Sequence, residues 1–142
     1  HGLGDLALDG VFGYVNGKNR DSGDDLYNIH PLHTLLTLSQ ARGRWSNALE
    51  TEWWGRKDGL SDVRNEIETA SYTLVHLRTA YTWKQVRLDA GIENLFDRAY
   101  ALPLGGAYVG QGKTMSLTGG PAWDTAVPGA GRTLYTGVNI KF

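Results

Sequence analysis

Charged and histidine side chains that could do acid–base or metal chemistry recur at alternate positions of several β-like stretches. The main set is Glu50, Glu52, His76, Arg78, Arg87, Asp89 and Glu93, with Asp9 upstream. Glu50 and Glu52 share one strand face, but a glycosidase sets its two carboxylates across a substrate cleft, which this spacing does not imply. Mixed charges in a water-filled interior more simply pair with one another. We therefore interpret this stripe as structural or docking rather than catalytic.

Metal-binding patterns are weak. His30 and His33 flank a Pro-Leu pair, but proline holds the chain extended and no third ligand is fixed, so a structural turn is favoured. The aspartates of 21–25 depart from the EF-hand spacing and indicate a solvated loop. Cysteine is absent, which excludes thiolate sites. No G-x-S-x-G elbow occurs. We expect neither a resident cofactor or metal nor enzymatic activity.

Composition restricts the partners. The net charge is −1, so no basic field is present to hold nucleic acid. Mean hydropathy is −0.35, and no apolar run approaches the ~20 residues that a membrane helix needs. Membrane β-strands are not excluded, because they expose apolar side chains on one face only. The chain starts at His1 without Met, and we interpret it as a processed or excised segment.

Six stretches alternate with period two and predict β-strands. They cover roughly 4–14, 32–42, 45–54, 72–83, 86–96 and 132–142. The connections after the first, third and fifth stretches are long, whereas the turns at 42–44 and 84–85 are short. Outer-membrane barrels show this asymmetry, with long outer loops and short periplasmic turns. The last stretch, with Val138, Ile140 and Phe142 on its apolar face, is typical of a barrel's terminal strand.

Three short motifs resemble elements of the TonB-dependent outer-membrane receptors. The run Asn28-Ile29-His30-Pro31 is similar to an "N-I-P" step, with His30 inserted. An "NLFD–Y" element comprises Asn94, Leu95, Phe96, Asp97 and Tyr100. The "PG–GR" entry to the last strand comprises Pro128, Gly129, Gly131 and Arg132.

The resemblance implies an antiparallel up-and-down transmembrane barrel of about 22 strands, of which residues 1–142 supply the C-terminal portion. The charged stripe would face the lumen and an N-terminal plug domain, and the opposite stripe would face lipid. Val138, Ile140 and Phe142 would act as a membrane-insertion signal. The outer loop at about 98–131 would contact ligand through Tyr100, Tyr108, Met115 and Trp123.

The implied function is uptake across the bacterial outer membrane of a metal chelate such as a ferric siderophore, haem, cobalamin or copper. The implied partners are the plug, the remaining barrel strands and the TonB complex. Two alternatives stay open, namely a passive porin or adhesin barrel and a soluble β-sandwich binding module. The ligand itself cannot be predicted from these residues.

Overall fold

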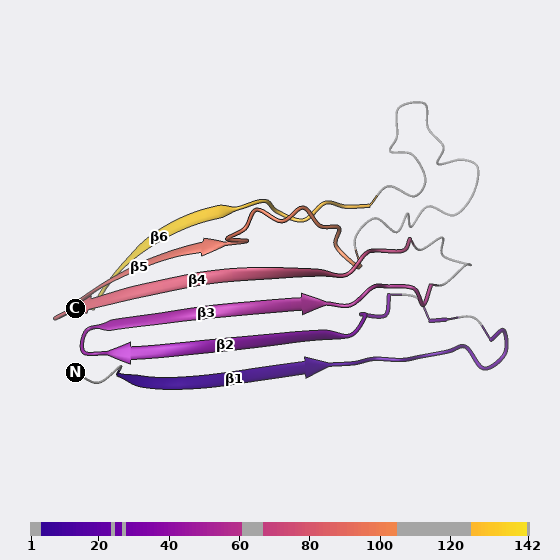
Figure 1. Cartoon of the computed structure of the whole chain (residues 1–142), viewed down its shortest axis with the longest axis horizontal. Coiled ribbons are helices and arrows are strands. Elements are labelled where there is room, and N and C mark those ends of the chain that lie inside the picture. The colour runs from indigo at the N-terminus through magenta and orange to yellow at the C-terminus, as the bar shows by residue number, and fades with distance from the viewer. Residues whose placement is uncertain (1–3, 24, 27, 61–66, 105–125, 142) are drawn as a thin grey trace, which may run out of the picture.

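The described residues form one six-stranded antiparallel sheet. The computed structural model describes residues 4–23, 25–26, 28–60, 67–104 and 126–141. Six strands lie in the order β1-β2-β3-β4-β5-β6, each beside its neighbours in sequence (Figure 1). Their bounds are β1 Asp5–Gly13, β2 His33–Arg42, β3 Trp45–Trp54, β4 Tyr72–Trp83, β5 Val86–Glu93 and β6 Thr133–Ile140. The described residues include no helix of the length and hydropathy needed to span a bilayer. The predicted all-β meander is confirmed.

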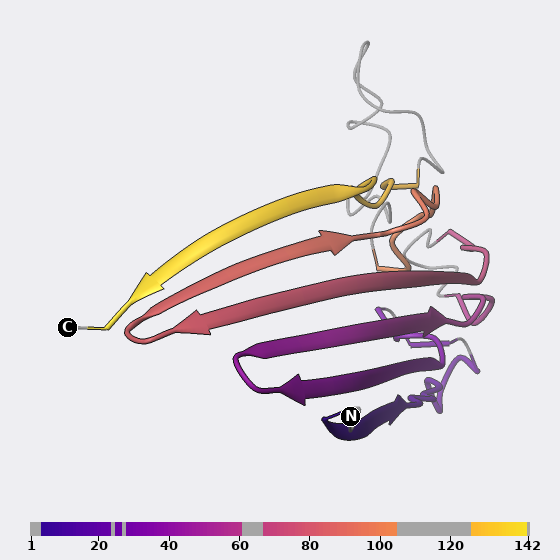
Figure 2. The same ribbon diagram turned by 60° about the vertical axis from the view of Figure 1, so that its left-hand side comes forward.

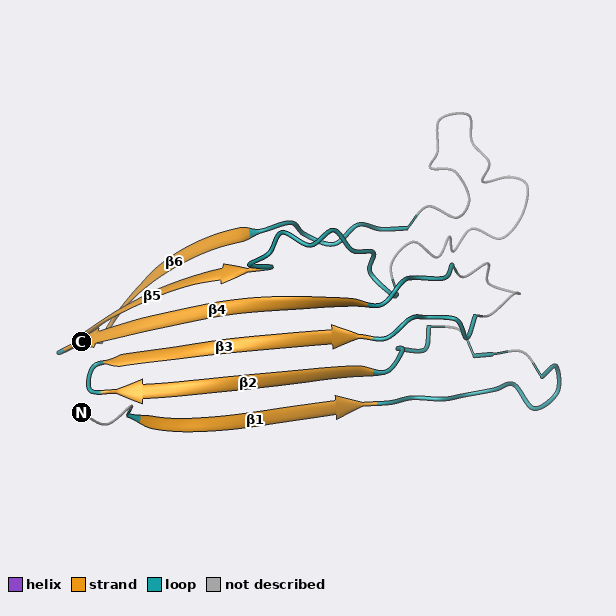
Figure 3. Ribbon diagram, viewed as in Figure 1, coloured by secondary structure: helices purple, strands orange, loops and turns teal. Residues whose placement is uncertain are grey.

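The connections differ in length at the two ends of the sheet (Figure 3). Two-residue turns join β2 to β3 and β4 to β5, because Arg42 pairs with Trp45 and Trp83 with Val86. The first turn residue has positive φ in both turns, 60° at Gly43 and 54° at Lys84, as tight hairpins of matching twist require. The described parts of the three long connections all lie at the opposite end of the sheet. The predicted long–short alternation is therefore present in the structure.

The prediction for the fifth strand was wrong at its end. Pairing in β5 stops at Glu93 rather than at Phe96. The next residue, Asn94, has a φ of 49°, and Asp97 has a φ of 52°. Left-handed backbone breaks the pleat, so the period-two pattern does not extend to Phe96. The last strand ends at Ile140, two residues before Phe142, which lies outside the described residues.

The register places side chains of one character on each face. We call one of these faces the outer face, and it is mostly apolar and well exposed. Its large apolar side chains include Leu6, Leu8, Phe12, Leu36, Leu38, Trp45, Leu49, Trp53, Leu77, Trp83, Leu88, Leu134, Val138 and Ile140. Leu134 is 72% exposed. Buried apolar side chains within the described ranges are Tyr72, Leu74 and Ala80, which lie on the other, inner face. A single sheet with so little core leaves its apolar face for another apolar phase to cover.

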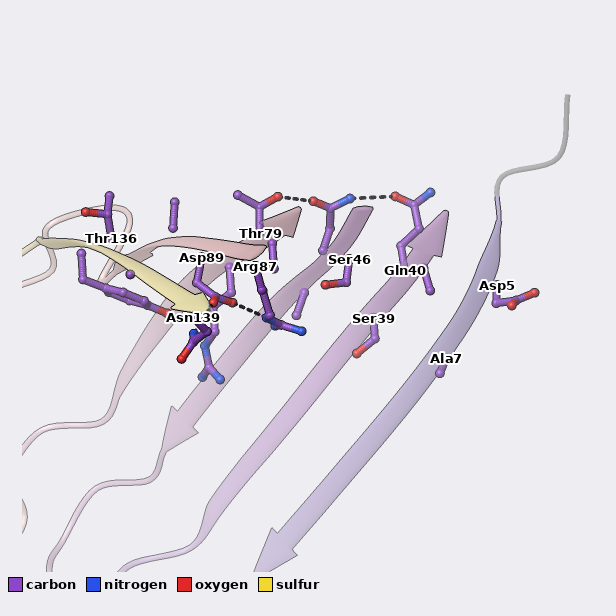
Figure 4. A pocket seen from close by; sticks show the side chains of 18 of the residues that line it. Asp5, Ala7, Ser39, Gln40, Ser46, Thr79, Arg87, Asp89, Thr136 and Asn139 are labelled. Atoms are coloured by element: carbon purple, nitrogen blue, oxygen red, sulfur yellow. Dashed lines mark hydrogen bonds and ion pairs between the residues drawn. The ribbon is translucent and has the colours of Figure 1, made fainter. Parts of the chain in front are cut away.

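The sheet is curved (Figure 2). Near the short turns, residues from all six strands line an open hollow of about 780 Å³ that includes Asp5, Ser39, Ser46, Arg78, Arg87 and Asn139. These side chains belong to the inner face, and Figure 4 shows Ser39 and Ser46 on the side of the sheet opposite to Gln40 and Thr79.

One row of the outer face is polar. Gln40, Asn47 and Thr79 lie on directly paired positions of β2, β3 and β4. The Thr79 hydroxyl donates to Asn47 Oδ1 at 2.7 Å, and Asn47 Nδ2 donates to Gln40 Oε1 at 3.4 Å. An unpaired polar group in hydrocarbon costs several kcal/mol. These cross-strand bonds make the polar row compatible with an apolar environment.

We predict that Asn47 and Thr79 are energetically coupled. A double-mutant cycle with Asn47→Ala and Thr79→Ala in the intact protein should give a coupling free energy of about 1 kcal/mol, as for hydrogen bonds within membrane proteins. The measurement is the free energy of unfolding in urea. Asn47→Ala and Thr136→Ala, three strands apart on the same row, should be additive. Additivity of the first pair would contradict the bond.

Candidate functional site

The NLFD–Y and PG–GR motifs meet in space and form one hydrogen-bonded unit, which we call the clasp. Its centre is Asn94, only 3% exposed and directly after β5. Asn94 Oδ1 accepts from the Arg98 N–H at 2.8 Å, and Asn94 Nδ2 donates to the Arg98 carbonyl at 2.9 Å. The same Nδ2 donates to the Ala130 carbonyl at 3.1 Å. One side-chain amide therefore joins segments 36 residues apart.

Asp97 and Tyr100 complete the clasp. Asp97 Oδ1 accepts from the Arg132 N–H at 2.8 Å, immediately before β6, while the Arg132 guanidinium lies 3.9 Å from Asp97 Oδ2. The Gly129 N–H donates to the Tyr100 carbonyl at 2.9 Å. The Tyr100 ring occupies the space that a Cβ of residue 129 would fill, so only glycine fits there. The motif residues thus set where β6 begins.

The two remaining residues of the NLFD–Y element, Leu95 and Phe96, turn toward β4. The Leu95 N–H donates to the Val75 carbonyl at 2.8 Å, which ties the turn to β4 beyond the end of β5. Phe96 is 74% exposed. It lines an open groove with Trp53 and Val75 of the outer face. Phe96 therefore extends the outer apolar surface past the end of its strand.

Two ion pairs and one histidine–carboxylate contact account for six of the seven residues of the predicted stripe. Glu50 Oε1 lies 2.6 Å from Arg78 Nη2, Glu52 Oε2 lies 3.5 Å from His76 Nε2, and Asp89 Oδ1 lies 2.8 Å from Arg87 Nε. The two glutamates reach diagonal neighbours on β4, as cross-strand geometry allows.

Further hydrogen bonds fix these groups. The Asn94 N–H donates to His76 Nδ1 at 3.2 Å, which leaves Nε2 to carry the hydrogen facing Glu52. Asn139 Nδ2 donates to Asp89 Oδ2 at 3.0 Å. Glu93, the seventh member, ends β5 opposite Thr133 and is exposed. The arrangement is that of a self-paired wall, and it includes no base aligned with a nucleophile among the residues the structure describes.

Aromatic side chains form a second feature at the long-loop end of the inner face. His33, Trp54 and Tyr72 lie on one directly paired row of β2, β3 and β4. The ring centroids of His33 and Trp54 are 4.7 Å apart with planes at 20°, and those of Trp54 and Tyr72 are 6.3 Å apart at 25°. Tyr100 of the clasp extends the row, 4.5 Å from Tyr72. His30 lies beside the other end, 5.5 Å from Trp54.

We call these five rings the aromatic shelf: His30, His33, Trp54, Tyr72 and Tyr100. Trp54 Nε1 donates to Glu52 Oε1, so the shelf is anchored to the charged stripe. An open hollow of about 420 Å³ lies against it, lined also by Leu74, Leu102, Pro103 and Leu104. Burial, followed by the nearby His33 and Lys57, lowers the pKa of His30 below its ordinary value. The lowered pKa favours the neutral form of the His30 imidazole.

Of the four predicted ligand-binding residues, one lies within the described part of the chain. Tyr100 lies on the shelf, whereas Tyr108, Met115 and Trp123 lie outside the described residues. Trp54 and Tyr72 were missed as site residues. Both lie on the polar stripe, Trp54 as the last residue of β3 and Tyr72 as the first residue of β4. Two large aromatic residues on an otherwise polar stripe are the sequence signal that could have identified them.

This chain is similar in sequence and in fold to known transport and utilization proteins. No protein-family model matches the chain. Heme/hemopexin utilization protein C of Haemophilus influenzae strain Rd is 32% identical over 103 residues, covering 67% of this chain, and that of another strain is 31% identical. The chain spans about 14% of the length of these curated relatives. Among solved structures, the copper transporter OprC matches 100% of this chain and 22% of its own, with a TM-score of 0.80 and 24% identity.

We predict that Asn94→Ala destabilises the intact protein by about 2–3 kcal/mol, because buried backbone groups of the clasp lose their partners. The free energy of unfolding in urea measures this. Asn139→Ala removes one exposed hydrogen bond of the same residue type and should cost no more than ~0.5 kcal/mol. Equal effects of the two substitutions would show that the clasp is not the stabilising unit.

Proposed function

The chain belongs to the family of TonB-dependent outer-membrane receptors, and from this we propose that it forms part of an active transporter for a metal chelate. Its place is the outer membrane of a Gram-negative bacterium. The outer face of the sheet contacts lipid. The inner face contacts the water-filled lumen and the plug domain.

The observation that supports this proposal is the opposite character of the two faces of one sheet. The outer face presents exposed leucine, valine and aromatic side chains across all six strands. The inner face carries the ion pairs Glu50–Arg78 and Arg87–Asp89 and the Glu52–His76 contact. A passive porin or adhesin shares this arrangement but not the clasp motifs. A soluble sandwich requires a second layer over the apolar face.

Within the transporter we assign three roles to this chain. Strand β6, Thr133–Ile140, forms the final strand of the barrel, and Val138, Ile140 and Phe142 act as the insertion signal. Residues 98–131 form a long outer loop at the ligand-entry side. The charged stripe of the inner face docks the plug, and Glu93, exposed at the end of β5, is one of its contacts. The energy for transport comes from the TonB complex acting through the plug.

Among metal chelates we propose haem. The curated relatives are named for heme and hemopexin utilization and are 31–32% identical to this chain. The likeness to the copper transporter, at 24% identity, concerns the fold. We infer that the protein is not an enzyme, because the inner-face charges pair with one another and the similar proteins are named for transport and utilization.

We predict that deleting the gene of the full-length receptor abolishes growth with haem as the sole iron source. Growth on ferric chloride should stay within twofold of the parent strain. Growth curves on the two iron sources measure this. Loss of growth on a ferric siderophore, with growth on haem retained, would contradict the choice of haem.

We also predict that deleting Phe142 from the full-length receptor lowers its outer-membrane level several-fold, because the terminal aromatic residue belongs to the insertion signal. Quantitative immunoblots of outer-membrane fractions measure this. Deletion of Gly23, at an exposed connection, is the control and should leave the level unchanged. Equal levels of both variants would remove the assigned role of Phe142.

A further inference from the structure

We propose that the short-turn end of the outer face is a binding site for an anionic phospholipid, whose phosphate contacts a cluster of exposed basic side chains. The cluster, which we call the basic rim, comprises Arg42, Arg44 and Lys84. This inference rests on the proposed placement of the outer face against lipid, and it adds the class of lipid that binds there.

The basic rim is continuous across the two short turns. Arg42 lies on the outer face as the last residue of β2, and Arg44 follows it in the turn to β3. The second turn adjoins the first, because the Thr82 N–H donates to the Arg44 carbonyl at 2.9 Å. Lys84 lies in this second turn, and both turns lie at the same end of the sheet (Figure 3). Three positive charges are thus placed along one edge of the outer face.

The charges of the basic rim are exposed, and no ion pair neutralises them within the described part of the chain. By contrast, Arg78 and Arg87 of the inner face have carboxylate oxygens at 2.6 and 2.8 Å. Asp5 and Asp89 also lie near the short turns, but they line the hollow of the inner face. Exposed positive charges without counter-charges attract an anionic partner.

Aromatic rings of the outer face lie at the level of the basic rim. The Lys84 ammonium is 5.6 Å from the centroid of the Trp83 ring, within the range of a cation–π contact. Arg42 pairs directly with Trp45, whose ring centroid is 4.8 Å from that of Tyr81. Tryptophan and tyrosine rings occupy the headgroup level of a bilayer. The basic rim is therefore placed where the phosphate of a lipid lies.

Beyond the rings, the outer face changes character in the order of the parts of a phospholipid. The polar row of Gln40, Asn47 and Thr79 comes next, about 7 Å further along the strands. The row after it is entirely apolar and comprises Leu8, Leu38, Leu49, Leu77, Ile92 and Leu134. Phosphate, ester groups and acyl chains would thus meet basic, polar and apolar rows in turn. A free phosphate ion would use the first of these rows alone, so the arrangement favours a lipid.

The test is native mass spectrometry of the full-length receptor in detergent, titrated with dioleoyl phosphatidylglycerol and with dioleoyl phosphatidylcholine. The two lipids have the same chains, but the second has no net charge. The wild type should bind phosphatidylglycerol at least tenfold more tightly, because each Lys or Arg near the surface strengthens binding of anionic lipid about fivefold. Glycerol 3-phosphate, which has the phosphate without the chains, should not compete.

The triple variant Arg42→Gln, Arg44→Gln and Lys84→Gln should lose this preference, while its affinity for phosphatidylcholine stays within twofold of the wild type. The unchanged second affinity shows that the variant is folded. Replacing Arg42 and Arg44 by Lys keeps the charges and should keep the preference. The matched control is Lys18→Gln with Arg20→Gln and Arg56→Gln, which removes three exposed positive charges from the long-loop end and should also keep the preference.

Equal affinities of the wild type for the two lipids, or equal losses in both triple variants, would overturn the site. Competition by glycerol 3-phosphate would assign the basic rim to a free anion, and a receptor dimer lost only in the rim variant would assign it to a second copy of the chain. Either result would also overturn the lipid site. The proposed function would stand in each case, because it fails on a different observation, namely a receptor that stays soluble and monomeric without detergent.

Discussion

The hydrogen-bonded register of the antiparallel strands is the constraint on which the other features depend. Once Arg42 pairs with Trp45, every later rung of β2 and β3 is set, and the same holds for β4 and β5 from Trp83 and Val86. Because side chains alternate across a sheet, each rung becomes a row of neighbours on one face. The polar row is one such row, and His33, Trp54 and Tyr72 of the aromatic shelf form another. The contacts Glu50–Arg78 and Glu52–His76 join neighbouring rows of the inner face. A slip of one residue would exchange the faces and dismantle all of them.

The clasp gives the family motifs a physical meaning. Strand β5 stops at Glu93, and 39 residues of sequence separate it from Thr133, where β6 begins. The entropic cost of closing so long a connection rises with its length. Asn94, Asp97 and Tyr100 bind the returning segment at Ala130, Arg132 and Gly129. The two ends of the connection are thereby fixed beside each other.

Sequence patterns predicted the six strands and their order, because period-two alternation and turn length are local properties. They also predicted the charged stripe, whose pairs Glu50–Arg78 and Glu52–His76 follow once the register is known. They failed at Phe96, since the left-handed backbone at Asn94 is stabilised by partners 36 residues away. They also missed the shelf. No periodicity reveals that Trp54, Tyr72 and Tyr100 come together, because Tyr100 reaches Tyr72 only through the fold of the clasp.

Three glycines lie directly beneath rings: Gly13 under His33 and Gly91 under Tyr135 on the inner face, and Gly129 under Tyr100 in the clasp. Without a Cβ below it, each ring settles against the backbone instead of standing upright. These rings therefore lie flat along the backbone and do not project from it, so the space beside them stays open. In the transporter that we propose, rings that lie flat against the backbone would leave the lumen beside this part of the wall wide.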